Sequence, residues 1–276
     1  MIPRVARLVR AEFLKLASQP FLYLGLAIIA ATIFFFEWLS PKFHSQPETL
    51  WRPYHAIQLF AYGFDWGLKI AEFVLVIFSA MMFAGEFDRG TIKNLLTRPI
   101  TRVDLFVAKC LTVLALGVGL YLFALYVSLA DAFARGELGP VWLADQYLIQ
   151  RPYEMIAVSA KKAVAMSFLP FVAAGFLGIL VSNCTESSGY AVAVALVLFN
   201  FGDVLTGVLP YGTERWSFLY YPPYVLDKLQ KYAVGGTEHW DESLETRLLY
   251  LKVPLLYIAA FLPPAFVIFR RRNISG

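Results

Sequence analysis

The sequence contains few charged side chains. Asp, Glu, Lys and Arg make up 16% of its 276 residues, whereas hydrophobic residues make up 59%. Soluble domains carry about 25% charged residues, and the mean hydropathy of this chain is +0.60. The composition therefore excludes a soluble domain and indicates a polytopic membrane protein.

Side chains that could ligate a metal are also scarce. The histidines, His44, His55 and His239, all fall in segments expected outside the membrane, so none can ligate a haem within it. A metalloprotease helix needs His and Glu at metal-ligand spacing, and no such pair is found. Cys110 and Cys184 are expected near the cytoplasmic face, where thiols stay reduced, so no disulfide is predicted. We expect no metal site and no catalytic residue.

The phosphate-binding pattern G-x-x-x-x-G-K-[ST] is absent, and so is any Gly-Lys pair. The chain therefore has no loop that could cradle nucleotide phosphates in this way. We attribute its net charge of +4 to membrane topology and lipid contact, and we do not predict nucleic-acid binding.

Long apolar runs dominate what is present. A helix needs about 20 apolar residues to cross a bilayer, and six runs meet this length: residues 21–39, 66–84, 103–129, 163–181, 189–209 and 248–269. The sequence predicts a single all-α integral membrane domain over residues 1–276, with six transmembrane helices. The external segments are then residues 40–65, 132–162 and 211–247. We expect short helical pieces and turns in the second of these, because it contains several Gly and Pro residues.

Clusters of basic residues indicate the orientation. Lys and Arg concentrate before the first run, between the second and third, and in Arg270, Arg271 and Arg272 after the last. The positive-inside bias places these clusters in the cytoplasm. An even number of spans puts both termini there as well. We expect a multi-pass protein of the inner membrane.

The first 19 residues have the pattern of an interfacial helix. Apolar residues recur at spacings of three and four in Ile2, Val5, Val9, Phe13 and Leu16, and basic residues take much of the other side. Such a helix lies flat on the inner leaflet before the chain turns into the membrane. The alternative is a plain basic leader that helps to set topology.

A polar, basic island, residues 85–102, separates the second and third runs. We predict a short amphipathic helix over residues 88–97, with Asp88 as its N-cap. Its apolar face consists of Ile92, Leu95 and Leu96, with Arg89 and Lys93 beside them. Pro99 ends this helix. Thr101 and Asp104 then have the spacing of a capping box, which predicts the start of the next helix.

The order of residues in the island resembles the cytoplasmic loop of ABC type-2 permeases, the membrane subunits of a class of ATP-driven exporters. The resemblance rests on Gly-Glu, then Arg-Gly-Thr-Ile-Lys, Leu-Leu and Pro, followed by Lys109 inside the next run. It implies that residues 1–19 form an elbow helix and that residues 88–97 form a coupling helix, which docks on a separate ATPase. The implied coupling residues are Glu86, Asp88, Arg89, Thr91, Ile92, Lys93, Leu95, Leu96 and Arg98. By charge alone, the island could instead be only a topology signal.

The resemblance also implies partners. Two permeases, identical or related, would pack together in the lipid above two ATPase subunits, which bind ATP and Mg²⁺, so this chain holds no cofactor. The expected cargo is a lipophilic or amphipathic substrate moved outward. Glu86, at the hinge before the coupling helix, would transmit motion if it pairs with a base on the elbow helix or on the partner.

Three polar residues inside the spans are candidates for a translocation path: Glu72, Asn200 and Asp203. Glu72 would lie about two turns below the outer surface, where a carboxylate faces protein or water. Its alternative role is a structural ion pair with Lys69, since Asp65, Lys69 and Glu72 form an i, i+4, i+7 ladder. Asn200 and Asp203 point to one side of a helix, although Asp203 could instead be solvated near the exit.

Other classes of function stay open. The chain could serve an ABC-type complex that does conformational or assembly work on an external partner protein, without substrate flux. It could also be a passive channel, although no ring of acidic or basic residues faces a clear pore.

Overall fold

The chain forms a long bundle of helices in the computed structural model. The structure describes residues 2–43, 55–91, 101–139, 141–143, 146–208, 214–233 and 244–272. The helices are α1 (Ile2–Ala17), α2 (Pro20–Phe43), α3 (Ala56–Asp88), α5 (Arg102–Arg135), α6 (Tyr153–Cys184), α7 (Ser188–Val208), α8 (Tyr221–Ala233) and α9 (Leu244–Arg271). Short 3₁₀ turns, η2 (Glu214–Trp216) and η3 (Phe218–Tyr220), precede α8. The strands are β1 (Val141–Leu143) and β2 (Gln146–Arg151).

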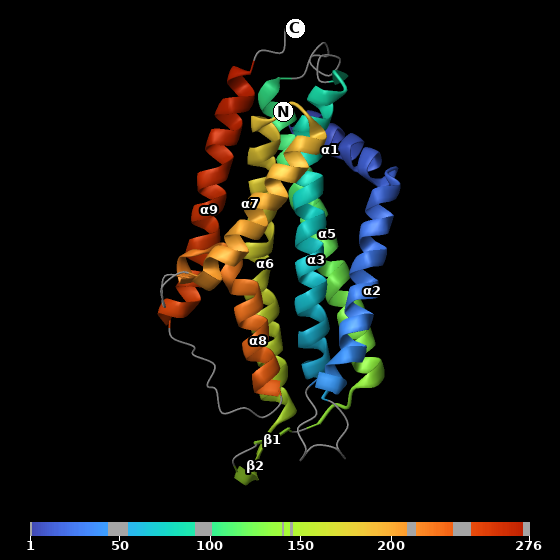
Figure 1. The fold of residues 1–276 in the computed structure, drawn as a ribbon, viewed down its shortest axis with the longest axis vertical. Coiled ribbons are helices and arrows are strands. Elements are labelled where there is room, and N and C mark those ends of the chain that lie inside the picture. Colours follow the sequence, from blue (N-terminus) through green and yellow to red (C-terminus); the bar gives the residue numbers. More distant parts are fainter. Residues whose placement is uncertain are drawn as a thin grey trace.

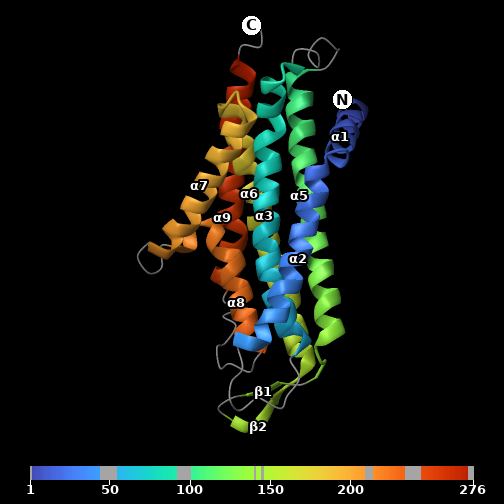
Figure 2. The same ribbon diagram turned by 45° about the vertical axis from the view of Figure 1, so that its right-hand side comes forward.

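The two ends of the bundle differ. Both chain termini lie at one end, which we call the terminal end, and the two strands lie at the other, which we call the hairpin end (Figures 1 and 2). Helix α1 lies across the flank of the terminal end, and α2 leads from it along the bundle. Helix α7 leans away from the other helices as it leaves the terminal end.

The all-α integral membrane fold is confirmed. Within the described part of the chain, the helices long and apolar enough to cross a membrane are Pro20–Leu39, Ala56–Asp88, Arg102–Arg135, Tyr153–Cys184 and Leu249–Arg271. The fifth predicted run falls on α7, whose apolar part, Ser188–Gly202, is shorter. A helix, α1, is present where the interfacial helix was predicted, and its place at the membrane surface stays a prediction.

Two helices extend into segments that were predicted to be external. Helix α3 begins at Ala56 and α6 at Tyr153, so residues assigned to the first and second external segments extend these helices instead. Between α5 and α6, strands β1 and β2 pair antiparallel where we predicted short helical pieces and turns. Apolar and β-branched residues in Val141–Leu143 and Gln146–Arg151 favour strands, a signal that the nearby Gly and Pro residues obscured.

Helix starts follow from capping chemistry. At α5 the predicted capping box is confirmed: the Thr101 hydroxyl accepts from the Asp104 backbone N–H, and the Asp104 carboxylate accepts from that of Thr101. At α3, His55 Nδ1 accepts from the backbone N–H of Ile57 at 3.2 Å. This tautomer leaves Nε2–H to donate to the carbonyl of Gly139 at 2.9 Å. His55 therefore ties the start of α3 to the chain that follows α5.

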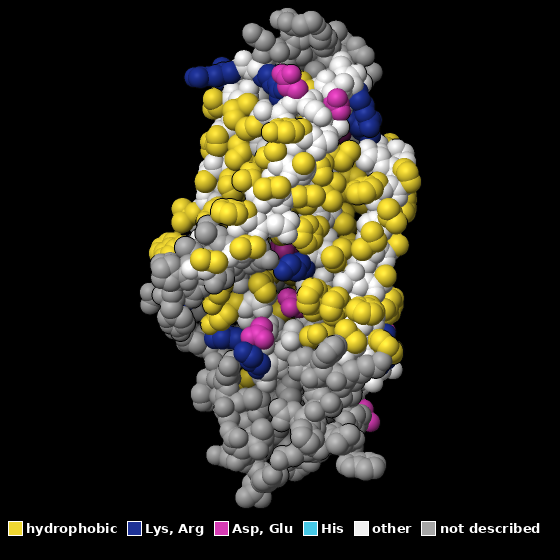
Figure 3. Space-filling view, viewed as in Figure 1, with side chains coloured by type: hydrophobic (Ala, Val, Ile, Leu, Met, Phe, Trp, Pro, Cys, Tyr) yellow, Lys and Arg dark blue, Asp and Glu magenta, His cyan; other side chains and the backbone are white. Residues whose placement is uncertain are grey.

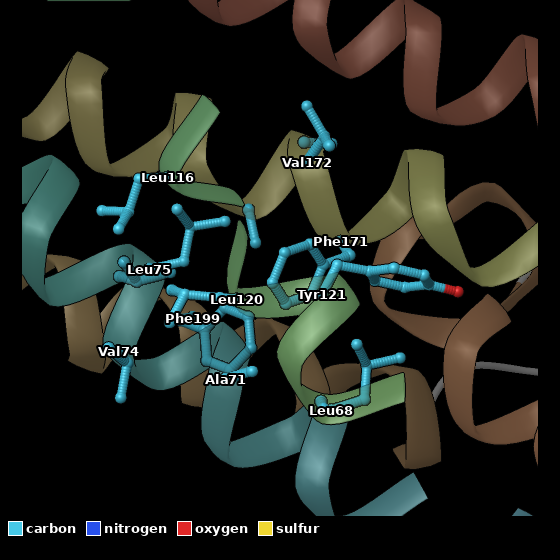
Figure 4. Close-up of a cluster of buried hydrophobic side chains, with 14 of the residues drawn as sticks. Leu68, Ala71, Val74, Leu75, Leu116, Leu120, Tyr121, Phe171, Val172 and Phe199 are labelled. Atoms are coloured by element: carbon cyan, nitrogen blue, oxygen red, sulfur yellow. The ribbon is translucent and has the colours of Figure 1, made fainter. Parts of the chain in front are cut away.

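Helix α3 is the centre of the bundle. In its apolar window 72% of the residues are buried, against 22% in α2 and 17% in α9. Figure 4 shows the core that this centrality creates, with side chains from four helices in one cluster. Leu68, Ala71, Val74 and Leu75 come from α3, Leu116, Leu120 and Tyr121 from α5, Phe171 and Val172 from α6, and Phe199 from α7.

Helices α3 and α6 approach each other closely near the terminal end. A Cβ added to Gly178 would lie 2.6 Å from Ser79 Cβ and 2.9 Å from the Val76 carbonyl oxygen, so only glycine fits there. One turn further, the buried Ser182 hydroxyl accepts from the backbone N–H groups of Phe83 (2.9 Å) and Ala84 (3.0 Å). The last turns of α3 and α6 are therefore held together.

We predict that Gly178→Ala destabilises the protein by about 1–3 kcal/mol, because the added methyl group overpacks against the backbone of α3. The measurement is the thermal midpoint of the purified protein in detergent. Gly119→Ala is the matched control, since nothing lies within 4 Å of the Cβ it would add. Equal midpoints for the two variants would contradict the close approach of α3 and α6.

We also predict that stability falls as the pH drops below about 6.5. Burial lowers the pKa of His55 from its usual value of about 6.5. The folded state thus favours the neutral ring. The stability that the neutral ring contributes is fully present above pH 6.5 and is lost as the pH falls through the pKa of His55 in the folded state. Comparing thermal midpoints at pH 7.5 and 5.5 tests this. In His55→Asn, which keeps an N-cap but does not titrate, the difference should shrink, whereas an unchanged difference would refute the assignment.

Candidate functional site

Four charged side chains meet at the terminal end, where α1, α3 and α5 come together. We call this the charge cluster: Glu12 and Lys15 of α1, Glu86 of α3 and Lys109 of α5. Glu86 Oε1 lies 2.9 Å from both Lys15 Nζ and Lys109 Nζ. Lys109 Nζ is also 3.3 Å from Glu12 Oε1. Two acids and two bases balance, so the cluster is neutral as a whole.

Lys109 is fully buried, with 0% of its side chain exposed. Its ammonium group donates to Glu12 (3.3 Å) and to the Met82 carbonyl (2.8 Å), besides its ion pair with Glu86. These acceptors match the three protons of an ammonium group. A buried charge is tolerated only when it is paired and hydrogen-bonded. The cluster therefore fixes the relative positions of α1, α3 and α5.

The side of α1 that faces the bundle is only partly apolar. Val5, Glu12 and Leu16 are buried, whereas Phe13, assigned to the apolar face, is 36% exposed. Glu12 turns inward because Lys109 lies there to neutralise it. Glu12 was not among the predicted site residues, although it stands at helical spacing from Val5 and Leu16 in the sequence. Lys109 was predicted only as the last residue of the motif, without a role.

Glu86 pairs with a base of α1, which was the condition for it to transmit motion. Its partner Lys15 lies on α1, the helix predicted to be the elbow. Glu86 is only 3% exposed, and its second oxygen, Oε2, accepts no hydrogen bond from the described residues. Glu86 is thus held against α1 by charge.

The predicted N-cap at Asp88 is wrong. Asp88 is the last residue of α3, Arg89 is the C-cap, and Gly90 follows with φ 65°, a left-handed conformation that glycine adopts readily at a helix end. The Asp88 carboxylate instead accepts from the backbone N–H (3.3 Å) and hydroxyl (2.6 Å) of Ser188. It therefore binds the start of α7.

Arg272 forms a second tie to the end of α3. Its guanidinium carbon lies 3.8 Å from the centre of the Phe87 ring. The same group donates to the carbonyls of Asn183 (3.0 Å) and Thr185 (2.9 Å) and pairs with Glu186 at 3.2 Å. We call the contacts of Phe87 and Asp88 with these residues the α3 tip junction.

Arg102 extends this junction to α5. Its guanidinium group donates to the backbone carbonyls of Arg270 (2.7 Å) and Arg272 (3.0 Å). For the terminal arginines we predicted only that they lie in the cytoplasm. Their partners lie far away in the sequence, so no local pattern could have identified them.

The other predicted coupling residues are described only in part. Arg89 and Thr91 are exposed, and the Thr91 hydroxyl donates to the Glu86 carbonyl at 3.4 Å. Ile92, Lys93, Leu95, Leu96 and Arg98 lie outside the described residues. The coupling helix itself therefore stays a prediction, and its start falls after Asp88.

Of the translocation candidates, the side chains of Glu72 and Asn200 are described. Glu72 is buried and lines a groove with Asp65 and Lys69, so the three ladder residues do share one face of α3. Asn200 is exposed, and its side-chain amide donates to the Leu196 carbonyl of its own helix at 2.8 Å. The side chain of Asp203 lies outside the described residues.

A second buried acid, Glu37, was also not predicted. Glu37, near the hairpin end of α2, is 1% exposed and accepts from the Ser128 hydroxyl at 2.9 Å. Its carboxyl group lies against Gly63, where an added Cβ would be 2.1 Å from Oε1. An acid in the last turns of the first apolar run was the available signal.

Among the described residues, no group of three or more His, Cys, Asp or Glu side chains could hold a metal ion.

Known proteins resemble this chain over much of its length. The sequence profile of the ABC-2 family transporter proteins matches residues 8–202. The uncharacterized membrane protein YdbK of Bacillus subtilis (strain 168) is 28% identical over 151 residues, which cover 54% of this chain and 58% of YdbK. The uncharacterized protein YhcI of the same organism is 24% identical over 205 residues, or 73% of this chain and 64% of YhcI. The chain thus spans less than two thirds of the length of either relative.

We predict that Lys109→Met lowers the free energy of unfolding by about 3–5 kcal/mol, because it leaves the buried carboxylates of Glu12 and Glu86 with Lys15 as their shared base. Glu86→Gln added to Lys109→Met should recover part of the loss, since it removes one of those charges. Thermal midpoints in detergent measure both effects. As the matched control, Lys231→Met removes one member of an exposed pair with Asp227 and should cost about 0–1 kcal/mol. A loss no greater than that of the control would show that the charge cluster is not stabilising.

Proposed function

This chain belongs to the ABC-2 family of transporter proteins, and we propose that it is a permease subunit through which a separate ATPase moves a lipophilic or amphipathic substrate outward. The observation that carries the proposal is the linkage around the end of α3. Directly before the predicted docking segment, Glu86 contacts α1 and α5, Asp88 contacts α7, and Phe87 contacts Arg272, which follows α9. This is where a pull from a partner would have to enter the bundle.

The mechanism follows from the stiffness of this linkage. When ATP draws two ATPase subunits together, each pulls on the segment that follows Asp88. Glu86 holds α1 and α5 through Lys15 and Lys109, while Asp88 holds α7. Because these contacts are buried or charge-assisted, the segment transmits its displacement to whole helices. Tilting α3 and α5 together then opens a path between two permeases.

The energy source lies outside this chain. ATP and Mg²⁺ bind to the partner ATPase, present in two copies, and this chain contributes no catalytic group. A second permease, identical or related, completes the complex in the lipid. The terminal end then lies on the cytoplasmic side of an inner membrane, and both termini lie on that side. The arginines of α1 and of the C-terminus lie at that end, as the positive-inside bias requires.

A second function, conformational work on an external protein, is favoured by one observation. Strands β1 and β2 extend beyond the helices at the hairpin end (Figure 1), where they offer a surface to such a partner. Substrate flux in vesicles separates the two functions, because an assembly subunit would hydrolyse ATP with its ATPase but move no substrate.

We predict that the double variant Leu95→Asp, Leu96→Asp loses association with the ATPase, since charges replace the apolar anchors of the docking segment. Co-purification with the ATPase and ATP hydrolysis in lipid nanodiscs measure the loss. Leu138→Asp, the same change at an exposed leucine of the hairpin end (58% exposed), is the control and should have no effect. If the double variant associates with the ATPase as well as the wild type does, residues 85–102 are only a topology signal.

A further inference from the structure

A groove on the flank of the bundle combines charges with apolar walls. We call it the lateral groove. The space within it is about 30 Å³, enough for a small polar head group but not for a whole ligand. Helix α3 contributes Asp65, Leu68, Lys69 and Glu72, α7 contributes Phe199, η3 contributes Leu219, and α8 contributes Pro222 and Pro223. Four elements thus converge on it.

The charges of the groove lie inside a helix that is long and apolar enough to cross a membrane. Asp65, Lys69 and Glu72 occupy about 10 Å of the α3 axis, at a rise of 1.5 Å per residue. Glu72 is 6% exposed. Ionisable side chains at this depth are costly and mark functional positions by default.

The surroundings define how a ligand reaches these charges. Figure 3 shows acidic and basic side chains in the middle of a broad hydrophobic face, away from both ends of the bundle. The walls Phe199, Leu219 and Pro222 are apolar. A ligand that enters from this flank arrives through the acyl chains of the lipid, and it therefore carries an apolar tail.

The sign of the charges defines the head group. Two carboxylates, Asp65 and Glu72, flank one ammonium group, Lys69, so the groove is acidic overall. An anionic head would face two like charges and gain one partner, whereas an ammonium head gains two carboxylates. Lys69 then competes with the ligand for the carboxylates.

We propose that the lateral groove binds an amphiphile with an ammonium head group, held by Asp65 and Glu72, whose tail lies along the apolar walls. As a statement about the substrate it rests on the proposed function, but the binding requires only the permease. This head-group chemistry has two sources, the aminophospholipid of the bilayer itself and an exported cationic amphiphile.

Native mass spectrometry of the purified permease, without any ATPase, tests the proposal. The probes are phosphatidylethanolamine, dodecylamine and, as the anionic comparison, phosphatidylglycerol. In the double variant Asp65→Asn, Glu72→Gln, binding of the ammonium probes should fall by about tenfold or more, since two charge-assisted contacts are lost. Glu154→Gln, which removes an exposed carboxylate near the start of α6, is the matched control and should bind like the wild type.

Lys69→Gln gives a result of opposite sign. Removing the competing ammonium group should strengthen binding of both ammonium probes, and this outcome does not depend on whether the double variant folds well. Preference for phosphatidylethanolamine over dodecylamine identifies the bilayer lipid as the source, and the reverse preference identifies an exported amphiphile.

Two results would overturn the proposal. One is binding of phosphatidylglycerol as strong as that of the ammonium probes. The other is weaker binding and a lower thermal midpoint for Lys69→Gln and Glu72→Gln alike, which would make the ladder a structural ion-pair network. Loss of coupling to the ATPase leaves all these measurements unchanged, so failure of this proposal and failure of the proposed function are distinguishable.

Discussion

The arrangement of the terminal end depends on one buried ammonium group. Lys109 has no contact with solvent, and its acceptors come from α1 and α3 while it belongs to α5. Any shift of one helix against the others would leave a charge unpaired in a medium of low dielectric constant, which costs several kcal/mol. The positions of α1, α3 and α5 relative to one another are therefore fixed. A membrane subunit driven from outside needs such a stiff element, because a soft one would absorb the displacement locally.

The α3 tip junction completes this linkage on the other side of the helix. Through Asp88 and Arg272, the end of α3 also contacts the turn between α6 and α7 and the end of α9. Further along, the lateral groove lies on the same helix, at Glu72. Helix α3 thus connects the segment proposed to receive the pull with the groove proposed to hold the ligand, without an intervening loop.

Sequence patterns predicted the fold better than the site. Apolar runs of the length of a bilayer predicted the long helices, and the Thr101–Asp104 spacing predicted the start of α5, because both signals are local. The site depends on pairs far apart in sequence, such as Glu12 and Lys109, which are 97 residues apart. Helical periodicity gives the apolar face of α1 but not what lies opposite each side of the helix, so the buried Glu12 was overlooked. The C-terminal end of α3 could have been predicted from the sequence, because Gly90 follows Asp88 at the distance typical of a helix C-terminus.

The fit of Glu37 against Gly63 restricts how α2 can move. The carboxyl group occupies the space of the missing Cβ, and Ser128 holds it from α5. A second contact of this kind lies along the same interface, where Ile33 fills the space at Gly67. Sliding α2 lengthwise by one residue would drive both side chains into the backbone of α3, whereas rotation about this point leaves them seated. Helix α2 can therefore rotate about this contact near the hairpin end, and its displacement is then largest at its other end, where it follows α1.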